Sequence, residues 1–301
     1  MKNVAFILMV SLFIISCTEP NQNRKKANLD ETESEKLKTE AEAPLKKSLN
    51  KAYFPIPSPE QMFGFINDNG VDYAKSLTNS AANESNYTDP TSKALNFGVY
   101  TADLAYAAAY QDIETTLELY TVVKKIGSDL NIEEMMNDEM LQEVQAHLED
   151  KDSLTIIAGQ SYYQAVEFME RNEMQGKLAL MSLGGWVESM YITLNAINGY
   201  DENEETTQRI ADQKVTFGNL YTYLKKNESF AGVKEAIANS QEIRSVFASL
   251  KEEKAVKATQ AKDSKKMVFG GDKRILITKE QFAALKMAIN NLRATITGQS
   301  A

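Results

Sequence analysis

Apolar residues recur every three or four positions through most of the chain after residue 53, a spacing typical of amphipathic helices. Helices are predicted over residues 59–69, 90–110, 113–126, 133–148, 153–171, 175–198, 204–226, 230–252 and 278–297. A shorter helix is expected over 71–77, and the Asn-, Ser- and Ala-rich stretch 79–86 is expected to be a loop. The pattern predicts an all-α fold, an irregular multi-helix bundle.

Capping residues fix where several of these helices begin. Asp89 followed by Pro90 is typical of an N-cap and a first helical position, and Ser58 with Pro59 repeats the pattern at the first helix. Thr278 and Gln281 have the spacing of a capping box. In the helix over 113–126, three residues on a helical period predict the buried stripe: Ile113, Leu117 and Tyr120.

The last helix carries a clear apolar stripe that ends before Gly298. Its members are Phe282, Leu285, Ile289, Leu292 and Ile296. An amphipathic helix normally buries such a face against its own domain, so we expect this helix to pack on the bundle; the alternative is that it engages a partner.

The stretch before that helix changes character. Residues 251–274 hold eight basic and four acidic side chains, which indicates a basic linker near 251–266; contact with anionic lipid headgroups is the alternative. A short β-hairpin is predicted just before the C-terminal helix, with strands at 267–269 and 274–277 joined through Gly270 and Gly271.

The helix over 90–110 is the most distinctive segment. Four small residues spaced three or four apart form one face, which allows another helix to approach closely: Gly98, Ala102, Ala105 and Ala109. Asp103 is the only charged residue between 94 and 110. Glu188 is placed similarly, in the middle of the apolar helix over 175–198.

If these two helices pack together, the carboxyl groups of Asp103 and Glu188 share a buried polar site. Side chains that can complete such a site are Tyr100, Tyr106, Asn96 and Gln160. A pocket of this kind holds a cation or a small polar ligand. The alternative, which we favour, is that each carboxyl group is satisfied by neighbouring polar groups and fixes the register of the helices.

The composition of the chain excludes several kinds of binding site. The chain has 301 residues and a net charge of −9, which disfavours binding to nucleic acid. A single histidine, His147, and a single cysteine, Cys17, exclude multi-histidine metal sites, disulfide frameworks and thiolate metal centres. No metal site, cofactor or catalytic residue is therefore predicted. Tyr162 and Tyr163 are expected in the core or at its edge.

The N-terminus has the form of a signal peptide. Lys2 precedes an apolar run over 4–15 that is too short to cross a bilayer core of about 30 Å. The residues Ile14-Ile15-Ser16-Cys17 that follow resemble the bacterial lipobox. That resemblance implies cleavage before Cys17, a lipid thioether on its sulfur, and an acyl chain such as palmitate on the new amino terminus.

The residues after Cys17 indicate the membrane to which the protein is sorted and how the folded domain is tethered to it. Thr18 stands where the usual inner-membrane retention signal has Asp, so the resemblance favours the outer membrane and leaves its periplasmic or surface face open. Residues 18–52 contain no aromatic side chain and mix acidic with basic ones, which indicates a flexible charged tether. The helical domain is then expected over 53–301.

Residues 95–106 read Leu-Asn-Phe-Gly-Val-Tyr-Thr-Ala-Asp-Leu-Ala-Tyr. With the lipobox and the segment 277–281, this helix resembles uncharacterised outer-membrane lipoproteins of Bacteroidota-type bacteria. The resemblance implies a helical lipoprotein and brings no established activity.

The expected function is binding or assembly support in the cell envelope, with the membrane and an envelope protein as partners and no enzymatic activity. The alternative is a metal- or small-ligand-binding protein or enzyme that uses the carboxylate pocket. Helical glycan-binding lipoproteins are a third class, but they are longer and rich in exposed tryptophan, whereas this chain has only Trp186.

Overall fold

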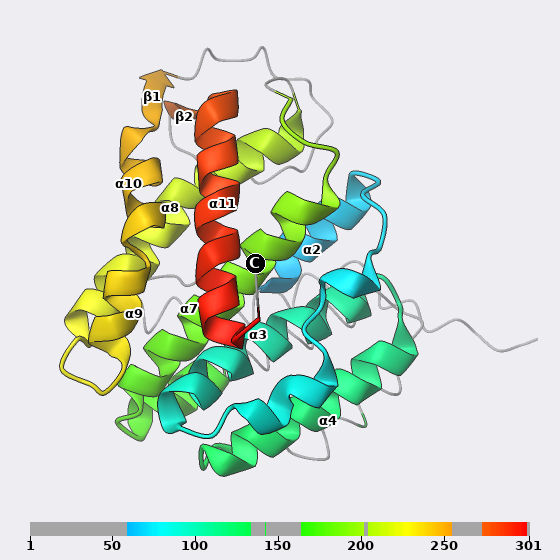
Figure 1. The fold of residues 1–301 in the computed structure, drawn as a ribbon, viewed down its shortest axis with the longest axis vertical. Coiled ribbons are helices and arrows are strands. Elements are labelled where there is room, and N and C mark those ends of the chain that lie inside the picture. The colour runs from blue at the N-terminus through cyan, green and yellow to red at the C-terminus, as the bar shows by residue number, and fades with distance from the viewer. Residues whose placement is uncertain (1–58, 134–141, 143–163, 202–203, 255–272, 300–301) are drawn as a thin grey trace, which may run out of the picture.

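The structure is a computed structural model that describes residues 59–133, 142, 164–201, 204–254 and 273–299 (Figure 1). Its named helices are α2 (Pro59–Asp68), α3 (Pro90–Ala109), α4 (Ile113–Asp129), α7 (Gln175–Ala196), α8 (Glu205–Lys226), α9 (Val233–Asn239), α10 (Gln241–Ser249) and α11 (Lys279–Thr297). Residues 164–171 are also helical. Two short 3₁₀ helices, η1 (Lys75–Leu77) and η2 (Ala81–Asn86), precede α3. The predicted all-α bundle is confirmed.

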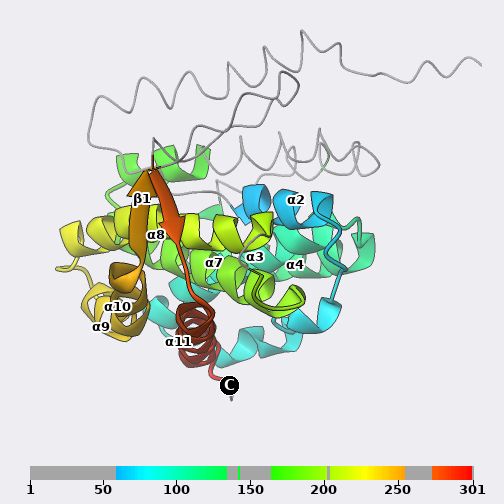
Figure 2. The same cartoon turned by 90° about the horizontal axis from the view of Figure 1, so that it is seen from above.

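Helices α3 and α7 lie at the centre of the bundle. Seen from above, α11 lies on one side of this pair and α2 on the other (Figure 2). No helix among the residues that the structure describes is long and apolar enough to cross a membrane. Although α7 is almost wholly buried, it is covered by other helices of the same chain, as expected from its polar residues.

Glycines set the distance between α3 and α7. A Cβ atom on Gly98 would lie 2.0 Å from the carbonyl oxygen of Met181, and one on Gly184 would lie 1.9 Å from that of Leu95. The two backbones are therefore in direct contact, as the small-residue face of α3 predicted. Further along that face, Ala102 is buried in a cluster that includes Phe63 of α2.

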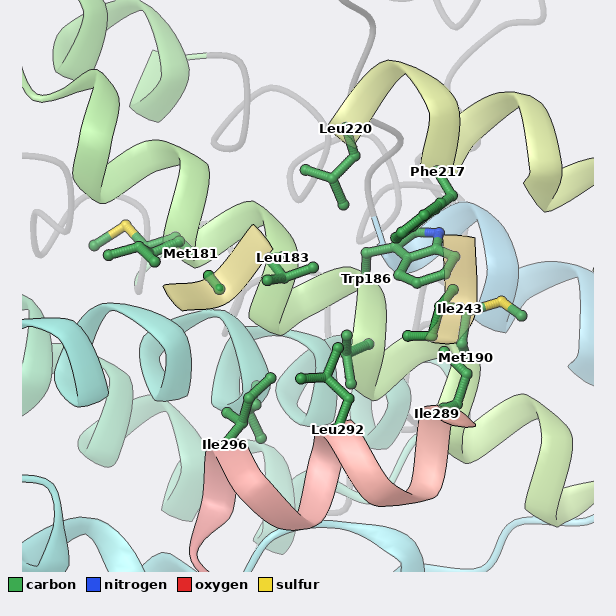
Figure 3. Packing of buried hydrophobic residues seen from close by; sticks show 14 of the residues in the cluster. Met181, Leu183, Trp186, Met190, Phe217, Leu220, Ile243, Ile289, Leu292 and Ile296 are labelled. Atoms are coloured by element: carbon green, nitrogen blue, oxygen red, sulfur yellow. The ribbon is translucent and has the colours of Figure 1, made fainter. Parts of the chain in front are cut away.

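The apolar core is built mainly around α7 (Figure 3). Trp186 of α7 packs on Phe217 of α8 with ring centroids 4.9 Å apart, and its indole Nε1 donates to Gln213 Oε1 at 3.0 Å. From α11, the whole predicted stripe is buried: Phe282, Leu285, Ile289, Leu292 and Ile296. The last helix therefore packs on its own domain.

The predicted buried face of α4 is wrong in part. Ile113 and Leu117 keep 42% and 37% of their surface exposed. The helix instead buries Leu119, Val122 and Ile126, together with Tyr120. Two apolar stripes compete on α4, and the side on which α3 lies decides which of them is buried.

Two other segments also differ from expectation. The predicted loop 79–86 contains η2, whose N-cap Ser80 accepts a hydrogen bond from the Ala82 backbone N–H. The predicted helix over 230–252 is broken at Ser240, whose hydroxyl donates to the carbonyl of Ile237, and this break separates α9 from α10.

The β-hairpin lies just before α11, as predicted, but its first strand comes from a different part of the chain. Strand β2 (Lys273–Leu276) pairs in antiparallel fashion with β1 (Lys251–Lys254), with Glu252 opposite Ile275. Leu250 is the single residue between α10 and β1, so the chain runs directly from the helix into the strand. Both Leu250 and Ile275 are buried. Residues 251–254 are therefore strand and not linker; 255–272, including the predicted strand 267–269, lie outside the described residues.

Candidate functional site: a buried polar cluster between α3, α7 and α11

The glycine contact brings the two lone carboxyl groups together. Asp103 follows Gly98 by five residues on α3, and Glu188 follows Gly185 by three on α7. Both acidic side chains are completely buried, with 0% of their surface exposed. Burial of this kind is costly for a charged group unless a counter-charge or hydrogen bonds compensate it.

The counter-charge is Arg293 of α11. Its Nε donates to Glu188 Oε2 and its Nη2 donates to Glu188 Oε1, both at 3.1 Å, which is a bidentate ion pair. The guanidinium carbon lies 4.4 Å from the centre of the Tyr191 ring. Because Arg293 is itself only 6% exposed, the pair is shielded from solvent.

Asp103 is held differently, by the loop before η2. The backbone N–H of Asn79 donates to Asp103 Oδ2 at 3.0 Å. Asp103 Oδ1 has no hydrogen-bond partner among the described residues. The Arg293 guanidinium faces Glu188, which leaves Asp103 without a cation of its own. Burial under these conditions favours the protonated, neutral form of Asp103.

The electrostatics agree with this assignment. Burial and the neighbouring Glu188 charge raise the pKa of Asp103 well above its usual range. Burial also raises the pKa of Glu188, but the Arg293 guanidinium opposes that shift. Burial alone would lower the pKa of Arg293, and the ion pair with Glu188 raises it instead. With Asp103 protonated, the cluster is neutral, because the positive Arg293 balances the negative Glu188.

Residues at and just after the end of α11 close the cluster. Arg293 Nη1 donates to Gln299 Oε1 at 2.7 Å, and Gln299 Nε2 donates to Asn79 Oδ1 at 2.9 Å. Asn79 Nδ2 in turn donates to the Tyr87 hydroxyl at 3.0 Å, and that hydroxyl donates to the carbonyl of Thr297 at 3.3 Å. The 79–87 loop and the turn after α11 are therefore linked to each other and to the buried charges.

The structure separates the two tyrosines that we predicted at this site. Tyr100 borders the cluster: its hydroxyl donates to the carbonyl of Ser80 at 2.8 Å, and its ring meets Tyr87 edge-on. Tyr106 lies outside it, because its hydroxyl accepts from the Ala74 N–H at 2.9 Å. Its ring packs in a separate aromatic cluster with Phe63, Tyr73 and Tyr110.

The other candidates fall elsewhere. Asn96 is buried and donates to the carbonyl of Ile296 at 2.8 Å, so it ties α3 to α11 about two helical turns before Asp103. Gln160, His147, Tyr162, Tyr163 and the lipidation candidate Cys17 lie outside the described residues.

Sequence reasoning missed Arg293 and Asn79. A signal for Arg293 was present, because it stands four residues after Ile289 and three before Ile296, and so lies on the apolar stripe of α11. A lone arginine on the apolar face of one helix is the expected counter-charge for a lone carboxylate in another apolar helix. Asn79 carried no such signal, since its role depends on a backbone N–H in a segment expected to be a loop.

The geometry supports structural more than chemical use of these groups. Every oxygen of Glu188 and one oxygen of Asp103 are engaged by donors from the same chain. Within the described ranges, no group of three or more His, Cys, Asp or Glu side chains is arranged to hold a metal ion. Comparison of the chain with protein-family models, curated proteins and solved structures finds no match.

Proposed function

We propose that this protein is a lipid-anchored protein of the bacterial cell envelope that acts by binding a partner or by supporting an assembly at the outer membrane, and not by catalysis. The observation that carries the proposal is the bidentate Glu188–Arg293 pair: the acidic groups that best suit chemistry are fully buried and engaged inside the fold. Such an arrangement favours a rigid binding body over a ligand pocket.

The anchor is proposed from the sequence. The lipobox-like residues Ile14-Ile15-Ser16-Cys17 support lipidation of Cys17, and Thr18 supports outer-membrane sorting. Two or more acyl chains hold a protein firmly to a bilayer. The charged stretch 18–52 then gives the folded domain reach around its point of attachment, because a flexible chain of this length spans roughly 30 Å.

Metabolic labelling tests the anchor. Cells that produce the full chain are fed an alkyne palmitate analogue, and inner and outer membranes are then separated. We expect a labelled protein in the outer membrane, and Cys17→Ser should abolish both the label and the membrane association. Thr18→Asp is the matched control: it should keep the label and move the protein to the inner membrane. An unlabelled wild-type chain would refute the anchor.

Partner capture tests the role. The full chain is crosslinked in intact cells and recovered with its partners, in parallel with the Cys17→Ser chain. We expect envelope proteins that are recovered with the wild-type chain and lost with the unanchored one. Recovery of no partner under several growth conditions would contradict the assembly role, and a bound metal or metabolite in the native protein would favour the carboxylate-pocket alternative instead.

A further inference from the structure

The buried cluster contains two carboxyl groups and one guanidinium. The titratable groups that interact with Asp103 are Glu188 on α7, Arg293 on α11 and Tyr100 on its own helix. Tyr87, at the end of η2, faces Glu188 and Arg293. Arg293 gives both of its aligned N–H groups to Glu188. Asp103 is therefore left without a cation of its own, and its Oδ1 has no donor among the described residues.

Asp103 also holds the segment that covers the cluster. Asp103 Oδ2 accepts from the Asn79 N–H, and Asn79 Oδ1 accepts from both Asn83 Nδ2, at 2.8 Å, and Gln299 Nε2. The same asparagine thus joins the carboxyl group, the 79–87 loop and the turn after α11. A change of charge on Asp103 acts on all three.

We propose that the proton on the buried Asp103 carboxyl group controls a latch, in which segment 79–87 and residues 297–299 close over the cluster when the proton is present and open when it is lost as pH rises.

The direction of opening follows from what can move. A second buried negative charge beside Glu188 requires water or a further cation. Helices α3 and α7 cannot separate to admit water without breaking the backbone contact at Gly98 and Gly184. Segment 79–87 and residues 297–299 are packed less tightly than the α3–α7 contact, since Asn83 and Gln299 are half-buried and Ser80 is exposed. Opening of this segment hydrates Asp103 at the lowest cost in packing.

Amide hydrogen exchange of the purified full-length protein tests the latch. Exchange is followed by mass spectrometry at about pH 6 and about pH 9, and each rate is corrected for the intrinsic effect of pH. We expect protection of peptides over 79–87 and 297–299 to fall about tenfold or more at the higher pH, because one unit of pKa difference is a tenfold change in the opening equilibrium. Protection of α8 should stay constant.

Asp103→Asn is the decisive variant. An asparagine accepts from the Asn79 N–H and carries no titrating proton, so segment 79–87 and residues 297–299 should remain protected at both pH values. Asp129→Asn, which removes an exposed charge paired with Lys93, is the matched control and should keep the wild-type response. A pH response in Asp103→Asn equal to that of the wild type would overturn the proposal.

A measurement on the unaltered protein keeps the test independent of that variant's folding. Infrared difference spectroscopy of the wild type should detect the carbonyl stretch of a buried, protonated carboxylic acid at about pH 6, and this band should vanish over the pH range in which protection is lost. Absence of the band at about pH 6, or loss of the band without loss of protection, would refute the latch.

Discussion

Arg293 on α11 and Glu188 on α7 are 105 residues apart in the chain and form two parallel hydrogen bonds of 3.1 Å in the protein interior. The pair fixes both the position and the rotation of the last helix against the central one. A buried pair of this kind adds little stability relative to well-packed apolar residues, but breaking it is costly because one charge is left uncompensated. Its main effect here is to determine how α11 docks.

Arg293→Met should lower the free energy of unfolding by about 3–5 kcal/mol, because Glu188 is left buried without its counter-charge. Urea denaturation of the full-length protein measures the loss. Arg244→Met is the control, since Arg244 is exposed and contacts the Tyr221 ring, and it should cost less than about 1 kcal/mol.

Replacing both partners, as in Glu188→Met with Arg293→Met, should recover much of that loss, because two apolar side chains of similar size need no compensation. The double variant should be more stable than the sum of the two single losses predicts. Strictly additive losses would mean that the two side chains do not act as a pair.

Gly98→Ala should destabilise the protein by about 3 kcal/mol, the upper end for overpacking, because the new methyl group would lie 2.0 Å from a backbone oxygen of α7 that cannot rotate away. Gly218→Ala is the matched control within α8. It has no atom within 4 Å of the added Cβ, so the same change should stabilise by about 0.4–1 kcal/mol. Thermal unfolding of the two variants should shift in opposite directions.

Stability should fall as pH rises above the unfolded pKa of Asp103, which is about 3.9. The folded pKa is raised, so between the two values the folded state binds more protons than the unfolded state, and each pH step favours unfolding. Asp103→Asn should flatten this part of the curve. The free energy of unfolding of both proteins, measured across pH, checks the slope; an unchanged slope in the variant would contradict it.

Asp89 should give the opposite dependence. Its carboxylate accepts from the Thr91 and Ser92 backbone N–H groups at 2.9 and 3.0 Å, and hydrogen bonds from Ser92 lower its pKa. The stabilisation is present above the unfolded pKa and is lost as pH falls through the folded one. Asp89→Ala should cost about 1 kcal/mol near neutral pH, and Asp89→Asn much less. A loss equal in both variants would assign the effect to something other than capping.

Local signals predicted the start of α3 and both ends of α11 correctly. Asp89 and Pro90 begin α3, and Thr278 with Gln281 forms the predicted capping box of α11, since each depends on residues only three positions apart. The end of α11 was equally clear, because Gly298 adopts a left-handed conformation with φ of 68°.

Tertiary contacts were harder to foresee. Ile113 and Leu117 have the correct period for a buried stripe, yet nothing in α4 alone shows on which side α3 lies. Burial of Asp103 and Glu188 was expected from their apolar neighbours. Their partners were not, because Arg293 and Asn79 come from distant parts of the chain.

The contacts made by α11 determine when the chain can fold during its synthesis. Glu188 pairs with Arg293 across 105 residues. Asn96 donates to the carbonyl of Ile296 across 200 residues, and Tyr87 donates to that of Thr297 across 210. A growing chain that has not yet added α11 cannot compensate its buried carboxylate. We therefore expect the nascent chain to stay loosely packed until α11 is made, a state that suits the export proposed from its N-terminus.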